Sequence, residues 1–188
     1  ISIKEDKNSI TFYNATYDKI VSAFSYLDSS LKVGVSIGTL HSDFSTTWLT
    51  TVNVSTDVPL DVQILEVDND YFIVFWRIAG DIKYKICKIE SATTISMSSE
   101  QNLSLSDCVN FVLSYSKEFD KVLVTYQLDS NAGGSEYRKL SYGLYTYDAS
   151  KMTLEGSDDL EEVATADYTT EIILLNSFRV CYNSDDNV

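Results

Sequence analysis

The segment that decides the fold is DYFIVFWRI, residues 70–78, because its pattern occurs three times in the chain. DKIVSAFSY at 18–26 and DKVLVTYQL at 120–128 align with it without gaps. Each copy begins with aspartate, continues with apolar and β-branched residues, and carries an aromatic residue at its seventh position. Those aromatic residues are Phe24, Trp76 and Tyr126. The copies begin 52 and 50 residues apart, which indicates a structural repeat.

A second apolar run precedes each copy, and a few polar residues separate the two runs. These first runs lie at 10–13, 62–67 and 111–115. Two runs rich in β-branched and aromatic residues around a short polar stretch are typical of a β-hairpin. An aspartate at the turn exit fits, because its side chain hydrogen-bonds nearby backbone. A looser fourth copy at 172–182, beginning near Asn176, has the same arrangement.

Each of the first three hairpins is followed by a further strand-like segment, at 31–37, 82–89 and 140–147. A fourth strand is predicted at 47–54 and again at roughly 95–105. Four strands in each repeat predict an all-β fold of antiparallel, four-stranded blades of the β-propeller type, with about three and a half repeats. A β-sandwich is the alternative architecture.

Two local features qualify this pattern. The lysines of the 82–89 segment, Lys83, Lys85 and Lys88, are expected at charged positions of an exposed strand. The stretch 158–166 is short and acidic, and we expect a loop or a single helical turn there.

The repeats predict a single all-β domain over residues 1–188, with repeat bounds at about 8–56, 57–105, 106–165 and 166–188. A propeller closes with at least about four blades, so three and a half repeats cannot close one. The unclosed blade leaves strand edges that need partners. Either the polypeptide continues beyond Val188, or other chains supply the missing strands. The sequence ISIK at residues 1–4 alternates like a strand and is suited to complement a neighbour. We therefore expect assembly with copies of the chain or with other protein subunits.

Composition excludes several classes of function. The net charge is −14, from 14 basic and 28 acidic residues, so nucleic acid is not an expected partner. The hydrophobic content of 44% is too high for a disordered chain. No apolar run approaches the roughly 18 residues of a membrane span. These properties predict an acidic, folded domain without a membrane span.

Sequons and cysteines bear on the compartment. Asn14, Asn53 and Asn102 each begin an acceptor motif for N-glycosylation. Cys87 and Cys108 are close enough in sequence to form a disulfide, and Cys181 is then left over. The alternative is three buried thiols. Many serine, threonine and tyrosine residues, with one histidine and two methionines, favour a secreted or cell-surface protein.

In each of the first three repeats, the third strand is followed by a recurring tail. The first copy of this tail is HSDFSTTW at 41–48. This tail resembles the Asp-box of the sialidase-type (BNR) propellers, Ser-x-Asp-x-Gly-x-Thr-Trp, through Asp43, Thr47 and Trp48. His41 stands at the serine position and Ser45 at the glycine position. The resemblance implies a structural role, in which the aspartate binds turn amides and the aromatic side chain packs between strands.

No catalytic constellation is predicted. Sialidases use three arginines, but Arg77, Arg138 and Arg179 occupy different positions in the repeats. The single histidine, His41, is expected in a turn. The acidic stretch 66–70 has oxygens that calcium could use, but it lacks the spacing and the glycine of a calcium loop, and a hairpin turn explains it fully. We therefore expect no enzyme activity, no metal and no cofactor.

The interpretation that follows is a non-catalytic structural or adhesive module of a secreted or cell-surface glycoprotein, within a larger assembly. A carbohydrate-binding or glycoside-hydrolase-related propeller domain is the first alternative, and glycans are then the ligands. An intracellular propeller that serves as a scaffold for protein partners is the second. Occupied sequons distinguish the extracellular interpretations from the intracellular one.

Overall fold

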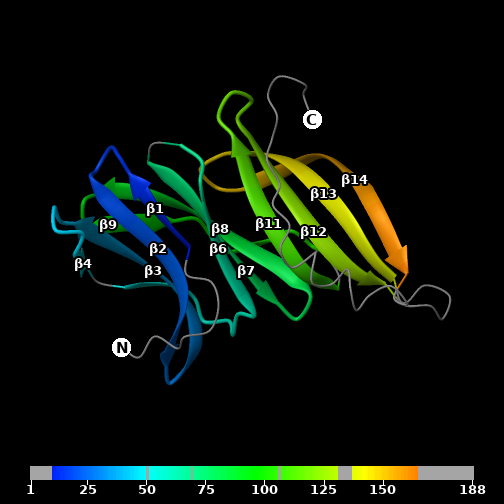
Figure 1. Ribbon diagram of the computed structural model, residues 1–188, viewed down its shortest axis with the longest axis horizontal. Helices are drawn as coiled ribbons and strands as arrows, with labels where there is room; N and C mark the ends of the chain where they lie inside the picture. The colour runs from blue at the N-terminus through cyan, green and yellow to red at the C-terminus, as the bar shows by residue number, and fades with distance from the viewer. Residues whose placement is uncertain (1–9, 50, 69, 106, 131–136, 165–188) are drawn as a thin grey trace. The chain divides into compact units, whose positions relative to one another are not determined.

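A computed structural model of the chain describes residues 10–49, 51–68, 70–105, 107–130 and 137–164. It contains three antiparallel β-sheets, which we name A, B and C in chain order (Figure 1). The predicted all-β, antiparallel class is therefore confirmed. Within the described residues, no helix is long and apolar enough to cross a membrane.

Sheet A is a meander whose outer strand is divided in two. Strands β1 (Ile10–Asn14), β2 (Lys19–Asp28) and β3 (Ser30–Leu40) pair in sequence order. Both β4 (Thr46–Trp48) and β5 (Val52–Ser55) then pair with β3, at different positions along it. The predicted strand at 47–54 is therefore present as two short pieces.

Sheet B repeats this arrangement. Strands β6 (Asp61–Glu66), β7 (Tyr71–Ile78) and β8 (Asp81–Ser91) pair in order. Strands β9 (Thr94–Met97) and β10 (Gln101–Asn102) both pair with β8. The same divided outer strand in two successive sheets agrees with the sequence repeat.

Sheet C has four continuous strands. They are β11 (Cys108–Ser116), β12 (Lys121–Ser130), β13 (Tyr137–Tyr147) and β14 (Met152–Ala164). The expectation of a loop or helical turn at 158–166 was wrong, because β14 runs through Ala164. Two register shifts against β13 mark β-bulges in this strand, at Glu155 and Leu160. Glu155 forms an ion pair with Lys121 of β12.

The hairpin turns show that the repeat has a common local geometry. Asp18 and Asp120, the first residues of two aligned copies, have φ angles of 51° and 53°, in the left-handed region. A tyrosine five residues earlier donates its hydroxyl to each carboxylate, Tyr13 to Asp18 at 2.6 Å and Tyr115 to Asp120 at 2.9 Å. Aspartate tolerates this backbone conformation better than most residues, which explains its recurrence at the turn exit.

Sheets A and B belong to one compact unit, and sheet C belongs to a second. In the first unit, apolar side chains of the two sheets form one continuous core, and the Phe12 and Phe72 rings lie 5.6 Å apart. The buried aliphatic residues of this core include Val21, Val33, Val35, Val54, Val62, Val74 and Ile89. Trp76 is fully buried among them. Burial of apolar surface from both sheets is the main favourable contribution to this packing.

Candidate interaction site

The first copy of the Asp-box-like tail forms the loop between β3 and β4. Two backbone hydrogen bonds close the loop: His41 N donates to Ser45 O, and Phe44 N donates to His41 O. Asp43 Oδ1 accepts from the Ser45 amide at 3.0 Å and from the Ser45 hydroxyl at 2.6 Å. Asp43 therefore binds a turn amide, as the resemblance implies. These bonds from Ser45 hold the pKa of the Asp43 carboxyl below its usual value.

Phe44 is placed unusually for an aromatic residue. Its φ angle is 64°, and its side chain is 87% exposed. The left-handed region is a genuine outlier for a bulky residue, and an exposed phenyl ring gains nothing from apolar burial. The glycine of the Asp-box pattern corresponds to Ser45, but the residue with positive φ is Phe44, one position earlier.

Leu40 and Trp48 lie on one face of the same hairpin. Leu40 pairs with Thr46 and Gly38 pairs with Trp48, so these four residues share a face of β3 and β4. Trp48 is 47% exposed, and Leu40 is also exposed. The implied packing of Trp48 between strands is therefore not what the structure shows. We call Leu40, Phe44 and Trp48 the aromatic tip.

The opposite face of the hairpin is polar. Thr39 pairs with Thr47 there. His41 Nε2 lies 2.8 Å from Thr47 Oγ1, and Lys19 Nζ donates to Thr39 Oγ1 at 2.9 Å. Thr47 thus helps to fix the loop through His41, while Leu40 and Trp48 lie on the other face. The hairpin presents two chemically different surfaces.

Phe44→Gly is expected to raise the free energy of unfolding by about 0.5–1 kcal/mol, because glycine adopts positive φ without steric cost. Chemical denaturation followed by circular dichroism measures this change. Ser45→Gly is the matched control, which places glycine where the Asp-box pattern has it. This variant is expected to lose stability, because it removes the hydroxyl bond to Asp43. The opposite ranking of the two variants would contradict the strain at Phe44.

The three sequon asparagines lie in different environments. Asn14 ends β1 and is 1% exposed, and its Oδ1 accepts a hydrogen bond from the Tyr17 amide at 3.0 Å. Asn53 in β5 is exposed, with its amide nitrogen 2.9 Å from the Ser55 carbonyl oxygen. Asn102 in β10 is exposed. Glycosylation at these positions stays a prediction.

Cys87 of the first unit and Cys108 of the second are both buried and are described as free thiols. The Cys87–Cys108 disulfide and its alternative of three buried thiols stay predictions. Burial raises the pKa of the Cys87 thiol to about 12, so this cysteine stays protonated near neutral pH. Cys181 lies outside the described residues.

Two of the three arginines considered for catalysis lie in strands. Arg77 lies in β7 and Arg138 in β13, while Arg179 falls outside the described residues. Of the acidic stretch 66–70, Glu66 ends β6 and Asp68 O accepts a hydrogen bond from Tyr71 N, while residue 69 lies outside the described residues. Among the described residues, no three histidine, cysteine, aspartate or glutamate side chains are grouped closely enough to hold a metal ion.

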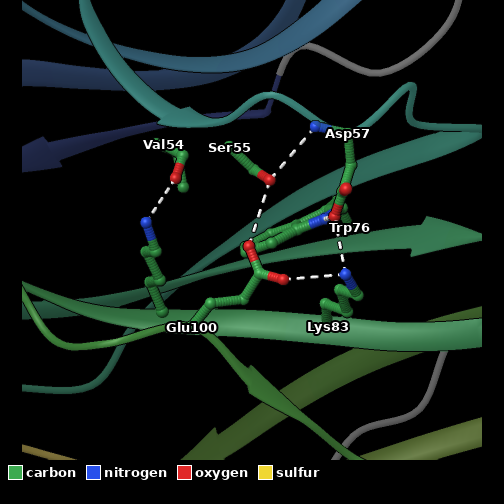
Figure 2. Close-up of polar contacts among 7 residues, drawn as sticks. Val54, Ser55, Asp57, Trp76, Lys83 and Glu100 are labelled. Carbon is green, nitrogen blue, oxygen red and sulfur yellow. Dashed lines mark hydrogen bonds and ion pairs between the residues drawn. The ribbon is translucent and has the colours of Figure 1, made fainter.

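Sequence reasoning missed a polar network in the first unit, which Figure 2 shows. Lys83 of β8 forms ion pairs with Asp57 at 2.9 Å and with Glu100 at 2.7 Å. Trp76 Nε1 donates to the same Asp57 carboxylate at 3.1 Å, and Ser55 Oγ donates to Glu100 at 3.1 Å. The expectation of an exposed strand was wrong for Lys83, which is partly buried. The network joins the segment after sheet A to sheet B.

Lys85 adds a second link beside this network. Its ammonium donates to the backbone carbonyl oxygen of Val54 in β5 at 2.6 Å (Figure 2). Lys83 and Lys85 are two residues apart on β8, so both point to the same face. The spacing of the two lysines was the sequence signal that could have indicated a shared face. The sequence did not identify the atoms that accept their hydrogen bonds.

A shallow pocket of about 250 Å³ lies on the other face of sheet B. Its lining includes Tyr71, Lys88, Glu90 and Ser96. Glu90 accepts hydrogen bonds from Lys88 at 3.1 Å and from Ser96 at 2.7 Å. Because these polar groups bind one another, the aromatic tip is the stronger candidate for contact with another molecule.

No protein-family model matches the sequence, and no curated protein matches it. The fold and the chemistry of the surface are therefore the basis for a functional argument.

Proposed function

We propose that the chain is a non-catalytic structural or adhesive module of a secreted or cell-surface glycoprotein, and that the aromatic tip is its contact surface. The observation that carries the proposal is the conformation of Phe44: its backbone has a strained, positive φ angle and its side chain is exposed. Residues held at a cost to stability are concentrated at functional sites. Exposed apolar groups that lie together mark interaction surfaces, and the exposed side chains of Leu40 and Trp48 share one face of the hairpin.

The proposed architecture is a set of propeller-type blades. Three meanders succeed one another along the chain, and the outer strands β4, β9 and β14 are short or largely exposed. In the first unit, sheets A and B share one core, and a packing of this kind between neighbouring sheets supports the proposal. Four-stranded antiparallel sheets are the units from which propellers are assembled.

The intracellular scaffold is the second candidate function. Its supporting observation is the pair of buried free thiols, Cys87 and Cys108. Reduced cysteines are the normal state in a cytosolic compartment. Glycan occupancy separates the two candidates, because N-glycans are added to secreted and cell-surface proteins.

We expect glycans at Asn53 and Asn102 but not at Asn14 in the chain from its natural source. A glycan at Asn14 would have to displace a side chain that is buried and bound to the turn amide of Tyr17. Native mass spectrometry before and after deglycosylation measures occupancy and assembly together, and glycopeptide mapping assigns the sites. Thr16→Ala, which removes only the Asn14 sequon, is expected to leave the mass of the attached glycans unchanged.

The same measurement tests the proposed contact. Wild-type chain is expected in assemblies larger than the 21.1 kDa monomer, and Phe44→Gly is expected to lose them although it folds at least as stably. An unmodified monomer would contradict the extracellular module and favour the intracellular scaffold. Glycosylated assemblies that persist in Phe44→Gly would contradict the aromatic tip as the contact surface.

A further inference from the structure

The indole of Trp48 is held in a defined position by a glycine. A Cβ atom at Gly38 would lie 2.8 Å from Trp48 Cε3 and 3.1 Å from Cζ3. The ring therefore lies against the β3 backbone at a place that no residue with a side chain could occupy without moving it. Trp48 is nevertheless 47% exposed, so this contact leaves a large part of the residue open to solvent.

The area of the aromatic tip limits the kind of partner. The exposed parts of Phe44 and Trp48 together present roughly 300 Å², on the area scale of buried aromatic side chains. A stable protein interface covers about 800 Å² on each partner. The tip alone is smaller than a whole protein interface, and a flat ring such as that of Trp48 has the size of one sugar residue of a glycan.

Charge limits the partner further. The chain carries a net charge of −14, and the loop beside Trp48 contains Asp43, whose carboxyl is ionised at neutral pH. Sialylated or sulfated glycans would be repelled by this field. A neutral sugar meets no such repulsion, and the Thr46 hydroxyl lies on the same face as Trp48.

We propose that Trp48, seated on Gly38, is a stacking platform for a neutral hexose residue of a glycan. The apolar face of a pyranose ring would cover the indole, while its hydroxyl groups stay in contact with water and with Thr46. This inference rests on the proposed adhesive function and names the ligand class of its contact surface.

The two tryptophans give a direct readout. Trp48 is exposed and Trp76 is fully buried, and they are the two tryptophans of the chain. Titration with neutral oligosaccharides of glucose, galactose and mannose is expected to shift the emission of Trp48 saturably and to protect it from acrylamide quenching. Sialylated and sulfated oligosaccharides are expected to bind at least tenfold more weakly.

Variants distinguish stacking from nonspecific adhesion. Saturation-transfer NMR with the same sugars is expected to show at least tenfold weaker binding for Trp48→Ala and retained binding for Trp48→Tyr. Gly38→Ala is expected to weaken binding severalfold, because its methyl group displaces the ring. Leu27→Ser, at another exposed apolar position, is the matched control and is expected to bind as wild type does.

The outcomes separate this inference from the proposed function. If no neutral sugar binds, or if acidic sugars bind as well, the stacking platform is overturned. The adhesive module still stands in that case, provided that Phe44→Gly and Trp48→Ala lose the assemblies seen with wild type. If both sugar binding and any effect on assembly are absent, the aromatic tip is not the contact surface and both proposals fail.

Discussion

Trp76→Ala is expected to lower the free energy of unfolding by about 3–5 kcal/mol, the usual cost of removing a large buried aromatic side chain. Trp76 is 0% exposed and lies in the core that sheets A and B share. Its Nε1 also donates to Asp57 at 3.1 Å. The substitution therefore leaves a cavity in the core and removes a donor from a partly buried carboxylate.

Equilibrium denaturation in urea, followed by far-ultraviolet circular dichroism, measures this effect. Trp48→Ala is the matched control, because it removes the same side chain from an exposed position, and its expected cost is below about 1 kcal/mol. Trp76→Phe preserves most of the packing and removes the hydrogen bond, so its cost is expected to be intermediate. Equal costs for Trp76→Ala and Trp48→Ala would contradict the shared core.

Lys83→Met is expected to cost about 1–2 kcal/mol at neutral pH, between the values typical of surface and buried ion pairs. Lys83 forms ion pairs with both Asp57 and Glu100 and lies between the two carboxylates (Figure 2). The substitution leaves the carboxylates of Asp57 and Glu100 without the cation that they share. Methionine retains the length and the apolar stem of lysine, so most of the packing is preserved.

The contribution of this network depends on pH in a defined direction. Partial burial acts to raise the pKa of Asp57, but hydrogen bonds from Lys83 and Trp76 outweigh it and hold the pKa below the ordinary value of 3.8. The stabilisation is therefore complete above pH 3.8 and is lost as the pH falls through the pKa of the folded state. The hydrogen bonds that Lys83 donates to Glu100 and to Asp57 raise its pKa above 10.5, so its contribution is lost only at still higher pH.

A series of urea denaturation curves at different pH values tests this assignment. The stability difference between wild type and Lys83→Met is expected to be constant between about pH 5 and 9 and to shrink below about pH 4. Lys32→Met, which breaks a single ion pair to the 66% exposed Asp28, is the control and is expected to cost less than Lys83→Met. A difference that does not change on acidification would show that Lys83 stabilises the chain through packing alone.

Most strands of the three sheets were predictable because their apolar runs are continuous or alternate strictly. The segments beginning at Asp18, Asp70 and Asp120 each form the second strand of a sheet, directly after the aspartate. Strand β14 was missed because its central residues are acidic and exposed, and local composition favours a loop. Its conformation comes from pairing with β13, which lies elsewhere in the sequence.

The candidate site was only partly predictable. The role of Asp43 followed from the resemblance, because an aspartate that binds turn amides is a local feature. The exposure of Trp48 and the left-handed conformation of Phe44 were not predictable, because both aromatic residues are ordinarily expected in a core. The partners of Lys83 lie 26 and 17 residues away in sequence, at a distance where side-chain patterns carry no information.

The strictly local pairing of the strands has a consequence for synthesis on the ribosome. Sheet A is complete at Ser55, whereas sheet B, which covers its apolar face, is complete only at Asn102, 47 residues later. At a translation rate of about 5–20 residues per second, this interval lasts about 2–10 s. Hairpins form in microseconds, so sheet A has ample time to form as it emerges. The valine-rich face of sheet A therefore stays exposed for seconds until sheet B is synthesised and packs on it. We expect the nascent chain to bind chaperones during this interval.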